Sequence, residues 1–239
     1  MTDLLFRTDP YQREASARVA GLTEEGGIVL DRTLFYPTGG GQPGDSGTLL
    51  SEHGEIAIAT AVKGQGDAVV LVPSEPVSLP PVGAEVTQRL DWDRRFAHMQ
   101  MHTALHLLSV AIPLPVTGGQ IGAGKGRLDF LMPEPPEDRD AVEAELNALI
   151  ARDLPVSEDW IDEADLDANP GLVKTMSVQP PRGAGRIRLV RIGEGDSQVD
   201  LQPCGGTHVA RTGEIGPARL GKIENKGKQN RRLTLHIGG

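Results

Sequence analysis

The sequence predicts an α+β protein in which a small N-terminal β-barrel domain precedes a two-layer α+β domain. Three observations lead to this class. Residues 1–88 form short apolar runs between turn residues, without a long helical pattern. Prolines then crowd residues 73–83, as in a stiff connection. Beyond this connection, helical and strand patterns come in blocks, which is typical of α+β domains. We therefore place the domains at residues 1–88 and 89–239.

The first domain is predicted from four candidate strands at residues 27–35, 48–50, 56–62 and 68–72. The last two flank Gly64-Gln65-Gly66-Asp67 and should form a hairpin. Short strands at such even intervals favour a small barrel.

The second domain begins with a helix that Asp91 or Asp93 can cap and that Pro113 stops near Ile112. A second helix, at residues 137–152, has an apolar stripe at the helical period, and a short third one is expected at 163–169. The predicted strands are residues 187–192, 198–201, 218–224 and 231–237.

Composition narrows the cellular setting. A single cysteine excludes an internal disulfide and fits a reducing compartment. The N-terminal residues lack the pattern of a signal peptide, and no apolar run reaches the length of a membrane span. We expect a cytoplasmic protein that does not bind membranes and is a monomer.

Two short runs about a hundred residues apart carry candidate metal ligands. His102 and His106 are four residues apart in a helical segment, so both imidazoles lie on one face. Cys204, the only cysteine, stands four residues before His208, and two glycines between them suit a tight turn close to the metal. Each run alone also fits a half-buried helix face or a small buried thiol. Together, one thiolate and three imidazoles favour zinc, with copper or iron as alternatives.

The helical run lacks the glutamate that follows the first histidine in many zinc peptidases, because Thr103 stands there. Peptide hydrolysis is therefore not indicated. Asp200, four residues before Cys204, is a candidate to hydrogen-bond one of the imidazoles from behind. Its alternative role is that of an exposed acid at a strand end.

These residues carry a resemblance to a known family. His102-Thr-Ala-Leu-His106 and the run Cys204-Gly-Gly-Thr-His208 together resemble the zinc motifs of the alanyl-tRNA editing proteins (AlaX), which are freestanding relatives of the editing domain of alanyl-tRNA synthetase. The stretch 35–47, with Gly39, Gly40, Gly41 and Gln42, resembles the glycine-rich motif of the longer members. From its residues alone, that stretch is equally well a hairpin loop.

The resemblance implies a barrel-like first domain and a Zn²⁺-dependent second domain at residues 89–239 that hydrolyses the ester of mischarged tRNA(Ala). The expected substrate is chiefly Ser-tRNA(Ala), with Gly-tRNA(Ala) as a second possibility. Two other functions stay open: an RNA-binding module with a structural zinc, and a zinc hydrolase of small esters or amides. Four protein ligands would close a zinc site. Catalysis then needs a ligand to leave, a fifth coordination position, or zinc that orients the substrate's amino group.

The amino-acid pocket is expected near the loop after Pro113. Residues 117–129 partly match a phosphate-binding loop, but Gly126 stands where that loop needs Ser or Thr, so we reject nucleotide triphosphate binding. By position relative to the family's pocket, Thr117 and Gln120 are the substrate-binding candidates, with Thr103 and Thr207 as alternatives beside the ligands. A plain glycine-rich turn is the competing interpretation.

The last part of the chain is basic and the rest is acidic. Residues 171–239 carry 12 Lys or Arg and 5 Asp or Glu, although the net charge of the chain is −9. We expect contacts with RNA phosphates there, while a solvated face is the alternative. The candidate contacts in the final strands are Lys222, Lys226, Lys228, Arg231 and Arg232. Further basic residues precede the cysteine at Arg182, Arg186, Arg188 and Arg191.

Overall fold

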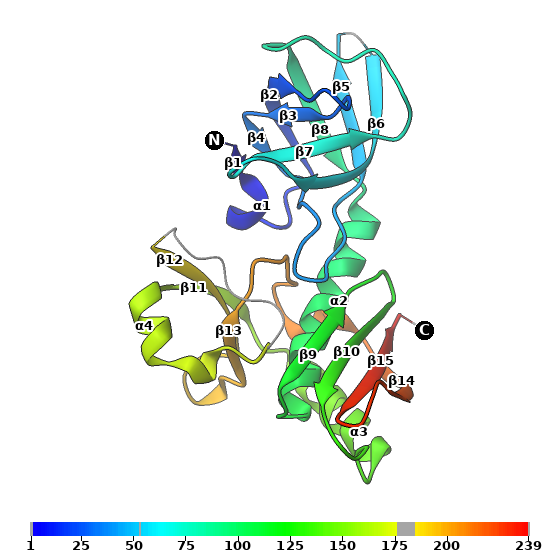
Figure 1. The fold of residues 1–239 in the computed structure, drawn as a ribbon, viewed down its shortest axis with the longest axis vertical. Coiled ribbons are helices and arrows are strands. Elements are labelled where there is room, and N and C mark those ends of the chain that lie inside the picture. The colour runs from blue at the N-terminus through cyan, green and yellow to red at the C-terminus, as the bar shows by residue number, and fades with distance from the viewer. Residues whose placement is uncertain (1, 53, 176–184, 239) are drawn as a thin grey trace. The chain divides into compact units, whose positions relative to one another are not determined.

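The computed structural model describes residues 2–52, 54–175 and 185–238. They form two compact units, Met1–Ala97 and His98–Gly239 (Figure 1). The α+β class predicted from the sequence is confirmed, and so is the barrel. The division falls inside helix α2 (Trp92–Ala111), later than the predicted boundary after residue 88. Among the described residues, no helix has both the length and the apolarity needed to cross a membrane.

The first unit is a closed six-stranded barrel with strand order β2-β3-β7-β6-β5-β8. Its strands are β2 (Glu14–Leu22), β3 (Ile28–Leu30), β5 (Gly47–Ser51), β6 (Gly54–Lys63), β7 (Val69–Pro73) and β8 (Glu85–Leu90). Outside the barrel, β1 (Asp3–Leu4) pairs with β4 (Arg32–Thr33), and α1 (Leu5–Thr8) follows β1.

Alternation of buried and exposed side chains explains the barrel. In β6 the buried Ile56 and Ile58 alternate with exposed residues, and β8 buries Val86 and Leu90 in the same way. The predicted hairpin of β6 and β7 is confirmed. The predicted strand 27–35 is wrong as one element. Asp31 interrupts it, because its carboxylate, not its backbone, accepts the hydrogen bond from Arg18 N.

The second unit contains two antiparallel sheets. The four-stranded sheet has the order β14-β15-β10-β9, from β9 (Val116–Gln120), β10 (Lys125–Leu131), β14 (Ala218–Asn225) and β15 (Asn230–Ile237). The three-stranded sheet has the order β11-β12-β13, from β11 (Val156–Asp162), β12 (Arg186–Ile192) and β13 (Asp200–Pro203). The sequence did not predict β11, because Ser-Glu-Asp at 157–159 breaks its apolar alternation. β13 begins two residues later than predicted, behind the short 3-10 helix η2 (Gly195–Ser197).

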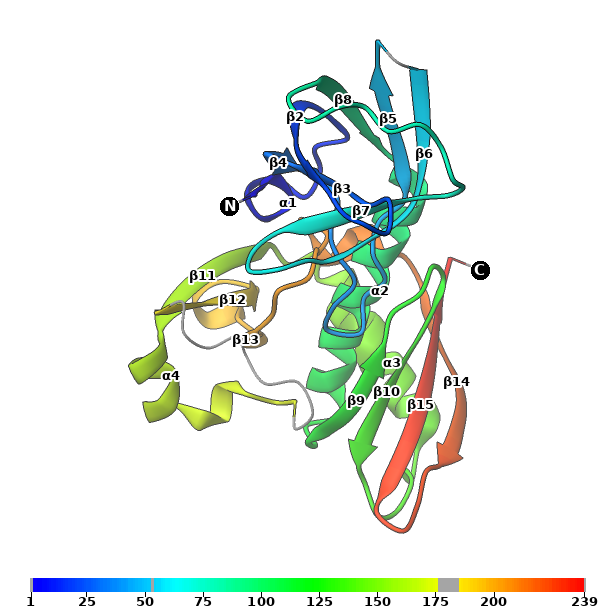
Figure 2. The ribbon, with the colours of Figure 1, turned by 45° about the horizontal axis from the view of Figure 1, so that its top comes forward.

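Helices cover one face of the four-stranded sheet (Figure 2). A side chain at Gly126 of β10 would collide with Met101 of α2, so the helix lies close against that strand. Helix α3 (Arg139–Ala151), capped by Asp138, is tied to β14 through Asn147, which bonds both backbone groups of Ala218. Helix α4 (Glu163–Ala168) packs on the three-stranded sheet, and two more 3-10 turns are η1 (Pro170–Leu172) and η3 (Thr212–Ile215). The apolar side of α2 therefore packs against the four-stranded sheet.

Candidate metal centre

The two runs of candidate ligands meet in the second unit. Helix α2 presents His102 and His106, and the loop after β13 presents Cys204 and His208. One ligand atom from each residue lies within 4.8 Å of the others. The three imidazoles are buried, and Cys204 is partly exposed. A metal ion can be bound by this cluster.

Two spacings around the cysteine sulfur suit a tetrahedral ion. Cys204 Sγ lies 3.5 Å from His102 Nε2 and 3.3 Å from His208 Nε2. Metal–nitrogen and metal–sulfur bonds of about 2.0–2.3 Å at tetrahedral angles place neighbouring ligand atoms about 3.3–3.6 Å apart. One thiolate with three imidazoles is also a donor set that zinc accepts. Geometry and donor chemistry therefore fit zinc.

A buried carboxylate orients His106. Asp200 Oδ2 lies 2.9 Å from His106 Nδ1, which leaves Nε2 for the cluster. The other oxygen, Oδ1, accepts from Lys174 Nζ at 2.6 Å, and Gln202 Nε2 donates to Oδ2 at 2.7 Å. Lys174 is itself fastened to β9, since its carbonyl accepts from Val116 N. Asp200 thus contacts an imidazole and a lysine, and no pattern in the sequence pointed to Lys174.

Thr103 orients His208 in a comparable way. Its hydroxyl lies 3.1 Å from His208 Nδ1, donates to Met99 O and accepts from Val209 N. A hydroxyl has one donor and two acceptor positions, so these contacts use all of them when His208 carries its proton on Nδ1. That tautomer leaves the lone pair of Nε2 pointing at Cys204. The hydroxyl of Thr103 is thus committed to the protein itself.

Arg188 on β12 holds the cysteine loop. Its Nη1 donates to Cys204 O at 2.7 Å and to Gly206 O at 3.0 Å, and its Nη2 pairs with Glu158 at 2.5 Å. Gly206 N in turn lies 3.4 Å from Cys204 Sγ, so the loop backbone donates a hydrogen bond to the sulfur. The Nε of Arg188 is buried without a partner in the part of the chain that the structure describes. One guanidinium thus fixes both ends of the turn that carries the thiol.

The surroundings shift the pKa values of the two oriented histidines in opposite directions. Burial by itself would lower the pKa of His106, but hydrogen bonds with Asp200 and Cys204 outweigh it and raise that pKa to about 9. Burial and the neighbouring His102 lower the pKa of His208 to about 3. The carboxylate therefore makes His106 a more basic ligand, while His208 is neutral at physiological pH.

The surroundings favour the ionised forms of Cys204 and Asp200. Burial raises the pKa of Cys204, but the interactions of its thiolate with the imidazoles of His102 and His208 outweigh burial and hold that pKa well below 9. Burial likewise raises the pKa of Asp200, and His106 together with Lys174 outweighs burial and brings it to about 2. A thiolate beside neutral or basic imidazoles is the form that binds a metal.

Comparisons with known proteins show which family this chain belongs to. The model of the threonyl and alanyl tRNA synthetase second additional domain matches residues 187–234, and that of class II (A) tRNA synthetases matches residues 9–94. The alanyl-tRNA editing protein AlaX-M of Methanosarcina acetivorans is 35% identical over 99% of both chains. This chain belongs to the AlaX family. Two further relatives are AlaX-L of Pyrococcus horikoshii, 32% identical over 100% of this chain and 58% of its own length, and the alanine–tRNA ligase of Pyrobaculum calidifontis, 38% identical over 92% of this chain and 25% of the ligase.

The substrate candidates of this AlaX protein lie on β9. Thr117 Oγ1 is within hydrogen-bonding distance of Asp129 O and Asn230 Oδ1. It can donate to only one of them at a time. Gln120 is exposed and accepts from Arg127 Nε. Their role in substrate binding stays a prediction.

The basic candidates differ in what they contact. Arg232 forms a two-pronged ion pair with Asp129 at 2.8 Å, and Arg231 donates to the carbonyls of Gly227 and Pro133. Three more candidates of the final strands are exposed, and their side chains have no partner among the described residues: Lys222, Lys226 and Lys228. Arg182 lies outside the described residues. Their contact with RNA stays a prediction.

The glycine-rich stretch forms a tight turn on the barrel unit. Gly39 and Gln42 exchange both backbone hydrogen bonds, and φ is +58° at Gly40 and +83° at Gly41, as a type I′ turn requires. Gln42 is buried, which anchors the turn. Further along, the buried Asp45 pairs with the buried Arg95, which also donates to Leu34 O. The positive φ angles of this turn therefore explain Gly40 and Gly41. A role of the stretch in substrate recognition stays a prediction.

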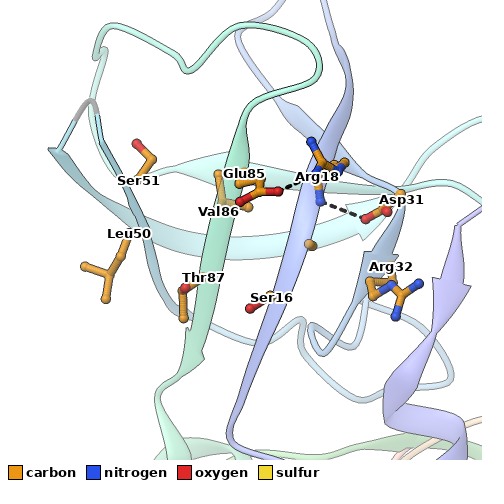
Figure 3. Close-up of a pocket in the computed structure, with 10 residues that line it drawn as sticks. Ser16, Arg18, Asp31, Arg32, Leu50, Ser51, Glu85, Val86 and Thr87 are labelled. Atoms are coloured by element: carbon orange, nitrogen blue, oxygen red, sulfur yellow. Dashed lines mark hydrogen bonds and ion pairs between the residues drawn. The ribbon is translucent and has the colours of Figure 1, made fainter.

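A hollow of about 570 Å³ lies on the wall of the barrel, between β2, β5 and β8 (Figure 3). Its charged side chains largely compensate each other, because Arg18 pairs with Glu85 and Asp31 lies beside Arg32. The lining contains none of the four metal-ligand candidates. This hollow therefore does not contain the candidate metal centre.

Proposed function

We propose that this AlaX protein is a zinc-dependent deacylase that removes the wrong amino acid, chiefly serine and secondarily glycine, from tRNA(Ala). The observation that carries the proposal is the cluster of His102, His106, Cys204 and His208 in a chain that matches AlaX-M over its full length. Zinc bound there supplies a Lewis acid that polarises an ester carbonyl and lowers the pKa of a bound water to about 7.

The protein's own groups prepare the site. Asp200 faces Nδ1 of His106, and Thr103 faces Nδ1 of His208, so both rings turn Nε2 toward the cluster. Arg188 keeps the cysteine loop in place. Because Cys204 is the only partly exposed member of the cluster, the aminoacyl end of the tRNA approaches from its side.

Selectivity requires a polar contact with the amino-acid side chain. Apolar packing alone cannot make a pocket favour serine over alanine. A buried polar group that hydrogen-bonds the serine hydroxyl can, because it is left unpaired when alanine binds, and this costs free energy. We propose Thr117 and Gln120 for this contact, and a positioning role for Thr103, whose hydroxyl is already occupied. Thr117→Val should lower the ratio of the serine rate to the alanine rate. The expected loss corresponds to the free energy of one hydrogen bond, ~1–3 kcal/mol.

The deciding experiment measures deacylation of Ser-tRNA(Ala) and Ala-tRNA(Ala) with purified protein, after chelation and after zinc is restored. Serine should be released much faster than alanine, and only with metal. Cys204→Ala should lose both zinc and activity. The control His98→Ala, which changes a buried histidine one turn before His102 but outside the cluster, should keep one zinc per chain.

The same experiment separates the alternatives. Binding of tRNA with stoichiometric zinc but without deacylation would identify an RNA-binding module whose zinc is structural. Equal rates on a serine ester with and without the tRNA body would identify a hydrolase of small esters.

A further inference from the structure

The outer face of the four-stranded sheet is set apart by its charges. Strand register pairs Gly126 with Leu235 and Leu235 with Leu220, and this row faces α2. Paired residues of an antiparallel sheet point to one face, and the neighbours along each strand point to the other. The adjacent row therefore points away from the helices and consists of Lys125, His236 and Arg219.

The basic side chains at this face are presented to solvent. Lys125 and Arg219 are exposed, as is Lys222 in the bulge of β14, and the side chains of all three have no hydrogen-bond or ion-pair partner within the described ranges. Lys226 and Lys228 continue the same charge into the hairpin between β14 and β15. From Arg219 to Lys226 the strand spans roughly 20 Å at about 3.3 Å per residue.

The acids at this face do not cancel that charge. Asp129 is already shared by Arg127 and Arg232, at 2.8 Å from each. Glu224 stands opposite Arg232 in the register. The five unpartnered basic residues therefore leave a positive surface on a chain whose net charge is −9.

In the three-stranded sheet of the same unit, by contrast, the basic side chains are paired with acids. Each described arginine of β12 has an acid on β11: Arg186 with Asp162, Arg188 with Glu158, and Arg191 with Asp159. Of these two sheets, only the four-stranded one has exposed basic side chains without a partner among the described residues.

We infer that the outer face of β10, β15 and β14, with Lys125, Arg219 and Lys222 at its centre, binds the phosphate backbone of the tRNA. The inference rests on the proposed function and names the surface through which that site receives its substrate. Exposed, unpaired Lys and Arg side chains that follow a strand for several phosphates are the footprint of such a contact.

The test measures the affinity of the full-length, zinc-loaded protein for uncharged tRNA(Ala) as a function of salt. Each phosphate contact contributes about 0.9 to the slope of log K against log salt on a double helix. Changing Lys125, Arg219 and Lys222 to Ala should therefore flatten the slope by about 2–3. A control with the same loss of charge changes Arg18, Arg89 and Arg186, which are exposed but ion-paired, and should leave the slope almost unchanged.

Equal slopes for both triple variants, or an unchanged slope in the first, would overturn the inference. Hydrolysis of the serine ester of adenosine, which lacks the tRNA backbone, should proceed at the wild-type rate in both variants. If the first triple variant shows a flattened slope but the wild-type protein deacylates no substrate, the tRNA-binding surface is supported and the proposed function is wrong. The failure of the inference and the failure of the proposed function can therefore be told apart.

Discussion

The two sheets of the second unit use basic residues in opposite ways. On the three-stranded sheet, arginines are paired with acids, and Arg188 also organises the cysteine loop beside the metal cluster. On the four-stranded sheet, Lys125 and Arg219 face solvent without partners in the described part of the chain. The difference shows that basic residues can be paired with acids on one sheet and left unpaired at the surface of the other.

The largest expected effect is the difference in zinc affinity and stability between variants of Arg188 and Arg191, two arginines of β12. Arg188→Ala should weaken zinc binding about 10–100-fold and lower the free energy of unfolding by about 3 kcal/mol, because two loop carbonyls and Glu158 lose their partner. Arg191→Ala removes an ion pair with the half-exposed Asp159 and should lower the free energy of unfolding by under about 1 kcal/mol. Chelator competition and chemical denaturation measure the two quantities.

Arg188→Lys sharpens this result. A lysine keeps the charge but cannot bridge two carbonyls and a carboxylate with a planar fork. We expect it to rescue little of the zinc affinity. Full rescue would mean that Arg188 acts through its charge alone and does not hold the loop.

A second contrast lies at β13. Asp200→Asn should weaken zinc binding by about tenfold or more, because His106 loses a charged partner and Lys174 loses its anion. Lys174→Met should have a smaller effect, since Asp200 keeps its contact with His106 through the other oxygen. The zinc dissociation constants of the two variants show which substitution weakens binding more. A larger loss in Lys174→Met would mean that the lysine, and not Asp200, has the main role in supporting the metal ligands.

The smallest effect concerns Asp129, the paired acid of the four-stranded sheet. Burial raises its pKa, but Arg232 and Arg127 outweigh burial and leave it below the usual 3.8. A lowered folded-state pKa gives stability that is present above pH 3.8 and is lost as pH falls through the folded-state value. The difference in unfolding free energy between wild type and Arg232→Ala should therefore be full near neutral pH and shrink below about pH 4. A difference that is independent of pH would show that Arg232 acts by packing.

Helical spacing alone brings His102 and His106 to one face, and a tight turn brings Cys204 close to His208. These are relations between near neighbours, which the sequence states directly. The alternation of apolar residues in β6 and its turn before β7 are local in the same sense. The ligand candidates, the α+β class and the barrel could therefore be predicted before the fold was known.

Tertiary structure decided which side chains stand behind the ligands. Lys174 reaches Asp200 across 26 residues, and Arg188 reaches Gly206 across 18 residues, through pairings that no spacing rule encodes. The same holds for the charged residues. Lys125 and Arg219, far apart in sequence, share a row only because β15 pairs with both strands, whereas Arg232 meets Asp129 and is neutralised. Sequence determines the charge of a side chain, but the strand register determines whether that charge is paired within the fold or left for a partner, because pairing depends on neighbours that only folding brings together.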